Sequence, residues 1–193
     1  MASLQSINPL DGTVVGTVQV TPTESVPTLA AKARKAQATW AALGISGRTE
    51  LLAKAAARFV REAESLGHLI TREMGKPLKE SVPEARTIGT SLESELAEIS
   101  EALEPESFQQ GSLRSVVHRD PFGVCAAITP WNFPMAMPNW MVLPALAAGN
   151  AVLFKPSEET PLSGQAYADI LGEHLPDHVL TVVHGGDEQG KAL

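Results

Sequence analysis

The chain has 193 residues, of which 44% are hydrophobic and 19% are charged, and its formal net charge at pH 7 is -7. This composition is typical of a globular protein, and the acidic balance argues against nucleic-acid binding, which needs a concentrated positive surface. One cysteine excludes an internal disulfide, and no secretory signal or membrane-length apolar stretch is evident, so we expect a soluble cytoplasmic protein with no membrane partner.

The N-terminal region predicts a β-hairpin followed by helices. Asp11-Gly12 lies between short apolar runs, which is a strong hairpin signal. Three helical patterns follow, at residues 29–43, from Ser46 as the N-cap to Ile70, and at residues 88–103. We interpret these as packing helices and assign them no chemistry.

The pattern changes after Gln110, where short apolar runs alternate with helical stretches. Strands are predicted at 123–128, 151–154 and 179–183, and helices at 138–148, 162–175 and 187–193. Apolar strands that alternate with helices predict a parallel sheet covered on both faces. We therefore expect an α/β fold, in which residues 1–110 form the hairpin and helices and residues 111–193 begin a βαβαβ core with a partial Rossmann-like sheet.

We expect this fold to be incomplete. Leu193 lies about two turns into the last helical pattern, with no glycine stop after it. A three-stranded parallel core would also leave a sheet edge exposed.

Polar segments follow each of the three predicted strands. They are Thr129–Pro134, Lys155–Glu158 and His184–Gly190. In an open parallel α/β sheet, ligands bind beyond the carboxyl ends of the strands. The sequence therefore predicts a ligand site where these three segments line one edge of the sheet.

The motifs at and between these strand ends resemble the aldehyde dehydrogenase superfamily. The runs Pro130-Trp131-Asn132-Phe133-Pro134, Pro144–Asn150 and Lys155-Pro156-Ser157-Glu158 have the order and spacing of that family, and segments 8–12 and 74–77 fit its N-terminal region. The resemblance covers essentially the whole chain. It implies the N-terminal part of the cofactor-binding domain of an NAD(P)-dependent enzyme that oxidises an aldehyde to a carboxylic acid and that is a homo-oligomer in its full-length form.

The resemblance also implies roles for individual residues. The amide of Asn132 would hold the aldehyde oxygen as it becomes an oxyanion, and a fixed donor aimed at developing charge is among the larger catalytic effects. Lys155 and Glu158 would reach the adenosine ribose hydroxyls. Because a carboxylate accepts a hydrogen bond from a 2′-hydroxyl and repels a 2′-phosphate, we expect NAD in preference to NADP.

The remaining predicted cofactor contacts are weaker signals. By resemblance, Ile128, Thr129, Pro130 and Trp131 contribute cofactor-facing backbone and walls, although their proline and aromatic content equally suits packing. Gly185-Gly186 would let a cofactor approach the backbone, but a glycine-rich connection from strand to helix needs no ligand. We predict no metal site.

The covalent chemistry of the family needs a cysteine nucleophile and a glutamate, which the resemblance places downstream of residue 193. Cys125 lies within an apolar strand, where we expect a small hydrophobe with a raised pKa. Met141 follows Trp140, where many family members carry a lysine. We therefore expect the chain alone to be inactive, with a non-catalytic nucleotide-binding or subunit-association role as the alternative. A semialdehyde is one possible substrate, but the sequence does not identify the aldehyde.

Overall fold

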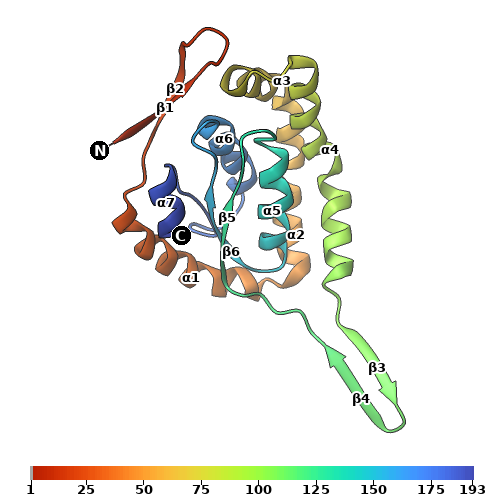
Figure 1. Ribbon diagram of the computed structural model, residues 1–193. Coiled ribbons are helices and arrows are strands. Elements are labelled where there is room, and N and C mark those ends of the chain that lie inside the picture. The colour runs from red at the N-terminus through yellow and green to blue at the C-terminus, as the bar shows by residue number, and fades with distance from the viewer. Residues whose placement is uncertain (1) are drawn as a thin grey trace.

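A computed structural model describes residues 2–193, which form seven strands and seven α-helices (Figure 1). The strands β1 (Ser3–Ile7) and β2 (Val14–Gln19) pair in antiparallel fashion. The predicted hairpin around Asp11-Gly12 is therefore confirmed, and Gly12 has the positive φ of 73° that this kind of turn favours. A short 3₁₀ turn (Thr23–Ser25) then leads into α1 (Val26–Ala42).

The predicted helix from Ser46 to Ile70 is two helices, α2 (Gly44–Ala53) and α3 (Ala56–Met74), so that prediction was wrong. Ser46 lies inside α2 and is not its cap. At the break, the Ala55 N–H donates to the carbonyl of Leu52 at 3.1 Å, the tighter spacing of a 3₁₀ turn. No glycine or proline marks this point, so the sequence gives no sign of it.

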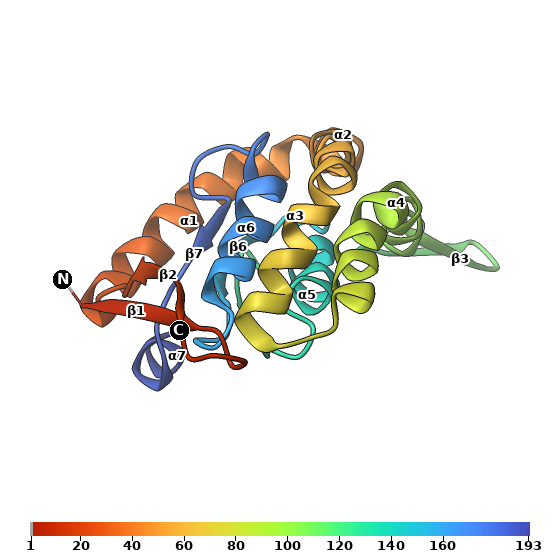
Figure 2. The same ribbon diagram turned by 90° about the horizontal axis from the view of Figure 1, so that it is seen from above.

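Helix α4 (Leu78–Ala102) contains the predicted stripe from Ile88 to Ile99 and begins earlier than predicted. Gly75, at φ 76°, ends α3, and Pro77 precedes the first residue of α4. The two long helices α3 and α4 lie side by side in both views (Figures 1 and 2).

A second hairpin follows α4 and was not predicted. Its strands β3 (Glu106–Gln110) and β4 (Leu113–Val117) are antiparallel, and every residue in both is exposed. The change of pattern assigned to Gln110 falls at the turn of this hairpin, where Gly111 has a φ of 59°. The hairpin extends away from the rest of the molecule (Figure 1).

The remaining strands, β5 (Val124–Ile128), β6 (Ala151–Lys155) and β7 (Leu180–Val182), form a parallel sheet in that order. They alternate with α5 (Ala136–Ala147), α6 (Pro161–Gly172) and α7 (Asp187–Ala192). The predicted α/β class and parallel sheet are confirmed. Within residues 2–193, no helix combines the length and the apolar character needed to cross a membrane.

The central strand β6 is buried along its whole length because both of its faces are covered. Val152 and Phe154 belong to the core formed with α3, α4, α5 and α6, whereas Ala151 and Leu153 pack in a smaller cluster with α1. Helix α1 therefore covers one face of the sheet, and α5 and α6 cover the other, with α3 and α4 outside them (Figure 2). This double burial explains why the strand is continuously apolar.

Candidate functional site

The carboxyl ends of the three parallel strands lie at one edge of the sheet. Ile128 is in register with Lys155, and the Thr129 N–H donates to the Lys155 carbonyl at 3.1 Å. On the other side of β6, the Val183 N–H donates to the Phe154 carbonyl at 2.8 Å. The polar segments that follow the strands therefore begin next to one another, as predicted.

Lys155 and Glu158 form an ion pair at the end of the central strand. The Lys155 Nζ lies 3.3 Å from the Glu158 Oε2 and 3.4 Å from the Pro156 carbonyl oxygen. The Lys155 side chain is only 5% exposed, while that of Glu158 is 42% exposed. A hydrogen bond from its own backbone N–H and the nearby Lys155 charge lower the pKa of Glu158, which keeps the carboxylate ionised. A donor and an acceptor thus stand side by side, an arrangement that suits a pair of neighbouring hydroxyl groups.

The two glycines between β7 and α7 differ in their surroundings. Gly185 is buried, has a φ of 145°, and packs so closely on the Gln189 side chain that a Cβ there would overlap it. Gly186 donates its N–H to the Gln189 Oε1 at 3.0 Å, and a Cβ at Gly186 would meet no atom within 4 Å. Packing and backbone conformation therefore explain why residue 185 is a glycine, whereas Gly186 leaves room for a ligand to approach the backbone.

The residues after β5 also differ in exposure. Thr129 is buried, whereas Ile128, Pro130 and Trp131 are exposed. Trp131 lines a cavity of about 330 Å³ that it shares with the N-terminal hairpin and the end of α3; the other lining residues are Ile7, Pro9, Glu73, Met74 and Glu159. The Trp131 ring thus stands beside the segment that follows Lys155.

Asn132 is exposed and lies in the loop between β5 and α5. The Lys76 Nζ is 3.8 Å from the centre of the Phe133 ring, directly after Asn132. Where the loop meets α5, Glu84 Oε1 accepts the N–H groups of Met135 and Ala136 at 3.2 and 3.3 Å. The Asn132 loop is therefore attached to α4 and the segment before it, whereas Lys155, Glu158 and the glycines lie at the ends of β6 and β7.

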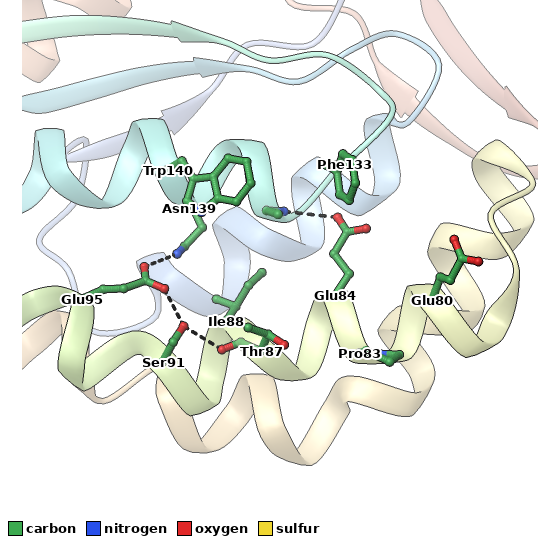
Figure 3. Close-up of a pocket in the computed structure, with 11 residues that line it drawn as sticks. Glu80, Pro83, Glu84, Thr87, Ile88, Ser91, Glu95, Phe133, Asn139 and Trp140 are labelled. Atoms are coloured by element: carbon green, nitrogen blue, oxygen red, sulfur yellow. Dashed lines mark hydrogen bonds between the residues drawn. The ribbon is translucent and has the colours of Figure 1, made fainter.

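A cavity of about 280 Å³ opens between α4 and α5, next to Phe133 (Figure 3). Its lining combines aromatic and aliphatic side chains with carboxylates: Glu80, Pro83, Glu84, Thr87, Ile88, Ser91 and Glu95 from α4, and Phe133, Ala136, Asn139 and Trp140 from the loop and α5. The cavity adjoins the Asn132 loop at Phe133, the residue directly after Asn132.

Hydrogen bonds fix the polar part of this cavity wall. The buried Tyr167 hydroxyl donates to Asn139 Oδ1 at 3.3 Å, Asn139 Nδ2 donates to Glu95 Oε2 at 2.7 Å, and the Ser91 Oγ lies 2.5 Å from Glu95 Oε1. Burial raises the pKa of Tyr167 well above its usual range, with the nearby Glu95 charge acting in the same direction, so this hydroxyl remains a donor.

Several of these residues were missed by sequence reasoning. Glu84, Ser91 and Glu95 follow one another at spacings of seven and four, which places them on one face of α4 beside the apolar stripe. That polar stripe was the available signal. In the sequence, Lys76 stands out only as part of the Met74–Pro77 segment, and its pairing with Glu84 is not visible there.

Cys125 is half-buried in β5, and burial raises the pKa of its thiol, as expected for a packing residue. In the part of the chain that the structure describes, residues 2–193, no group of three or more His, Cys, Asp or Glu side chains is placed to hold a metal ion.

Comparison with known proteins places this architecture in a wider group. The sequence model of the aldehyde dehydrogenase family matches residues 2–193. N-succinylglutamate 5-semialdehyde dehydrogenase from Sphingopyxis alaskensis is 40% identical over 164 residues, 83% of this chain and 34% of its own. Betaine aldehyde dehydrogenase 2 from Rhizobium meliloti is 35% identical over 189 residues, 97% of this chain and 39% of its own.

Solved structures agree with these sequence matches. NADP-dependent glyceraldehyde-3-phosphate dehydrogenase from Bacillus halodurans, complexed with NADP, has a TM-score of 0.91 at 27% identity over 99% of this chain and 42% of that one. An NAD-dependent benzaldehyde dehydrogenase from Corynebacterium glutamicum has a TM-score of 0.89 at 28% identity, with the same coverage of 99% and 42%. The chain thus spans roughly two fifths or less of the length of the relatives it matches.

Proposed function

The chain belongs to the aldehyde dehydrogenase family, and from that premise we propose that it carries the ribose-binding part of the dinucleotide site and the oxyanion donor of an enzyme that oxidises an aldehyde to a carboxylic acid. The observation that carries this proposal is the Lys155–Glu158 pair at the carboxyl end of the central strand. Ligands bind at this edge of a parallel sheet, where the strand ends and their connections meet.

The residues at this edge fit a dinucleotide. Lys155 offers an ammonium donor and Glu158 an ionised acceptor to neighbouring ribose hydroxyls, while Gly186 leaves its backbone open to approach. When bound, the cofactor would supply the hydride acceptor of the oxidation. Because the Glu158 carboxylate would repel a 2′-phosphate, we propose NAD as the preferred cofactor, although the family includes NAD-dependent and NADP-dependent members.

Asn132 would act on the aldehyde itself. Its exposed side-chain amide can donate to the carbonyl oxygen as negative charge develops there, while the cavity beside Phe133 receives the rest of the aldehyde. Removal of one such donor typically lowers the rate on the order of 100- to 1,000-fold. The substrate of the Sphingopyxis relative is named as a semialdehyde, and we propose a semialdehyde here as well.

We propose that residues outside this chain supply the nucleophile and the general base. Cys125 is the one cysteine present, and it lies half-buried in a strand with a raised pKa, which suits packing and not attack on a carbonyl. The 193 residues alone should therefore not turn over an aldehyde.

A role in subunit association is the second candidate, and the β3–β4 hairpin favours it. Phe108, Leu113, Val116 and Val117 are exposed on this two-stranded element. An isolated two-stranded hairpin is only marginally stable in water and gains stability when another surface covers it. We propose that a second copy of this chain covers the hairpin in a homo-oligomer.

Calorimetric titration of the purified chain with NAD tests the principal proposal. Lys155→Met should weaken NAD binding about tenfold or more, because it removes a charged donor from the ribose site. The matched control is Lys191→Met, which breaks another i,i+3 ion pair, with Glu188 at 3.0 Å, on an exposed face of α7. Equal NAD affinity in the wild type and Lys155→Met, or an equal loss in the control, would refute the proposed site.

A further inference from the structure

Lys76 and Glu84 form an ion pair that is buried on both sides. The Lys76 Nζ lies 2.5 Å from Glu84 Oε2, and the two side chains are only 9% and 5% exposed. Removing two charges from water is costly, so such a pair is retained only where its geometry and its other hydrogen bonds compensate. The remaining partners of this pair therefore indicate what it holds in place.

Those remaining partners lie in the Asn132 loop and at the first residue of α5. Glu84 Oε1 accepts the N–H groups of Met135 and Ala136, and the Lys76 ammonium lies 3.8 Å from the centre of the Phe133 ring. Residues directly after Asn132 are thus fixed from two sides. Asn132 itself is exposed, so its amide stays available to a ligand.

Helix α5 depends on this outside support at its first turn. No side chain of its own segment caps its N-terminus, and the N–H groups of Met135 and Ala136 are among the first-turn donors that a helix leaves without partners. Glu84 meets both of them from α4 and places its negative charge at the positive end of the α5 dipole. The pair thus sets where α5 begins, and with it the end of the loop that carries Asn132.

We propose that Lys76 and Glu84 are positioning residues for Asn132, which hold its loop in one conformation so that the side-chain amide is fixed before an aldehyde arrives. A preorganised donor stabilises an oxyanion because no reorganisation is needed when the charge develops. The catalytic meaning of this proposal rests on the proposed function of Asn132. The ordering of the loop by the Lys76–Glu84 pair is independent of that function.

Nuclear magnetic resonance on the isotopically labelled chain tests the proposal. The double variant Lys76→Met/Glu84→Leu removes the pair without leaving one buried charge unpaired. Amide hydrogen exchange at Met135 and Ala136 should become about tenfold faster or more, and the Asn132 side-chain amide should become more mobile, while β6 amides such as Val152 keep their protection. The control Lys191→Met/Glu188→Leu removes an exposed pair and should leave the Asn132 loop unchanged.

A conservative variant separates positioning from general stability. Lys76→Met/Glu84→Gln keeps an oxygen that can accept the Met135 and Ala136 N–H groups and leaves no buried charge unpaired, so it should restore much of the slow exchange that Lys76→Met/Glu84→Leu loses. Faster exchange spread evenly over the chain, or an Asn132 amide as rigid as in the wild type, would overturn the proposal. NAD affinity is the separate readout: if wild-type chain fails to bind NAD while the loop responds as expected, the proposed function fails and the positioning stands.

Discussion

Glu73 offers the sharpest test of how the segment after Lys155 and Glu158 is held in place. It lies in the last turn of α3, is 3% exposed, and accepts the N–H groups of Leu162 and Ser163 at 2.9 and 2.6 Å. Those two groups belong to the first turn of α6, which lacks a side-chain cap from its own segment. Since α6 begins at Pro161, shortly after the Lys155–Glu158 segment, Glu73 holds the helix that follows the candidate ribose site.

The free-energy effect of removing Glu73 follows from these contacts. A hydrogen bond to a charged group contributes about 1.5–3 kcal/mol, so two of them give about 3–6 kcal/mol. Removing a buried carboxylate also relieves part of its desolvation cost, which lowers the net loss for Glu73→Ala to about 2–4 kcal/mol. Glu73→Gln keeps one oxygen but turns an NH₂ toward the other backbone donor, so it should cost about 1–3 kcal/mol.

The pH dependence of this effect has a definite sign. Burial raises the pKa of Glu73 above its ordinary value of 4.5, against the opposing hydrogen bonds from the backbone N–H groups of Leu162 and Ser163. The folded state therefore holds the Glu73 proton more tightly than the unfolded state, and this group's contribution to the free energy of unfolding falls as pH rises from 4.5 through the folded pKa. Glutamine does not titrate. The difference in the free energy of unfolding between the wild type and Glu73→Gln, in favour of the wild type, should therefore be largest at the acid end of that range.

Urea unfolding followed by circular dichroism between pH 4 and pH 8 measures both effects. The control is Glu188→Ala in α7, an exposed carboxylate, which should change the free energy of unfolding by less than about 0.5 kcal/mol. The reasoning is refuted if Glu73→Ala behaves like this control, or if the wild type and Glu73→Gln differ by the same amount at every pH.

Three further tests concern the cofactor, the glycine turn and the exposed hairpin. Glu158→Gln should raise NADP affinity relative to NAD about tenfold in calorimetric titrations, because it removes the charge that faces a 2′-phosphate; an unchanged ratio would count against the NAD preference. Gly185→Ala should lower the free energy of unfolding by about 1–3 kcal/mol, because the φ of Gly185 is 145°. Gly186→Ala, where the new Cβ meets open space, should leave the free energy of unfolding nearly unchanged and weaken NAD binding. The site would be contradicted if thermal melts showed the larger stability loss for Gly186→Ala and titrations showed the weaker NAD binding for Gly185→Ala. Phe108→Ser should reduce self-association in sedimentation velocity experiments without changing the melting temperature, and association equal to the wild type would exclude the hairpin as the contact surface.

The parallel core could be predicted from the sequence because burial leaves a plain signal there. Ala151 to Phe154 is continuously apolar since both faces of β6 are covered, and the glycines and prolines around it mark the strand ends. The same strand-end rule located Lys155, Glu158 and the Gly185-Gly186 turn, because the edge at which a parallel sheet binds ligands is set by topology.

Two parts of the fold were not predicted, for different reasons. The break between α2 and α3 occurs within Ala53-Lys54-Ala55, where helix propensity is high and only tertiary packing decides the bend. The β3–β4 hairpin packs neither face against the molecule, so its strands lack the alternation of apolar and polar residues that marks a half-buried strand; the two-residue loop Gly111-Ser112 was the available local signal.

The support of Asn132 was also out of reach of the sequence. Lys76 and Glu84 are eight residues apart across the start of a helix, and their partners in the Asn132 loop lie about fifty residues further on. Only the packing of α4 against α5 brings these groups together. The motif identifies Asn132 as a candidate donor, whereas Lys76 and Glu84 come next to its loop only once the helices are packed.

The most direct test of the central claim is to map NAD binding on the isotopically labelled chain by nuclear magnetic resonance. If this edge of the sheet carries a dinucleotide site, the largest chemical-shift changes should fall at Ile128, Lys155, Glu158 and Gly186, and Lys155→Met should remove them. Shifts scattered over other elements, or no shifts at millimolar NAD in a chain that remains folded, would contradict the account.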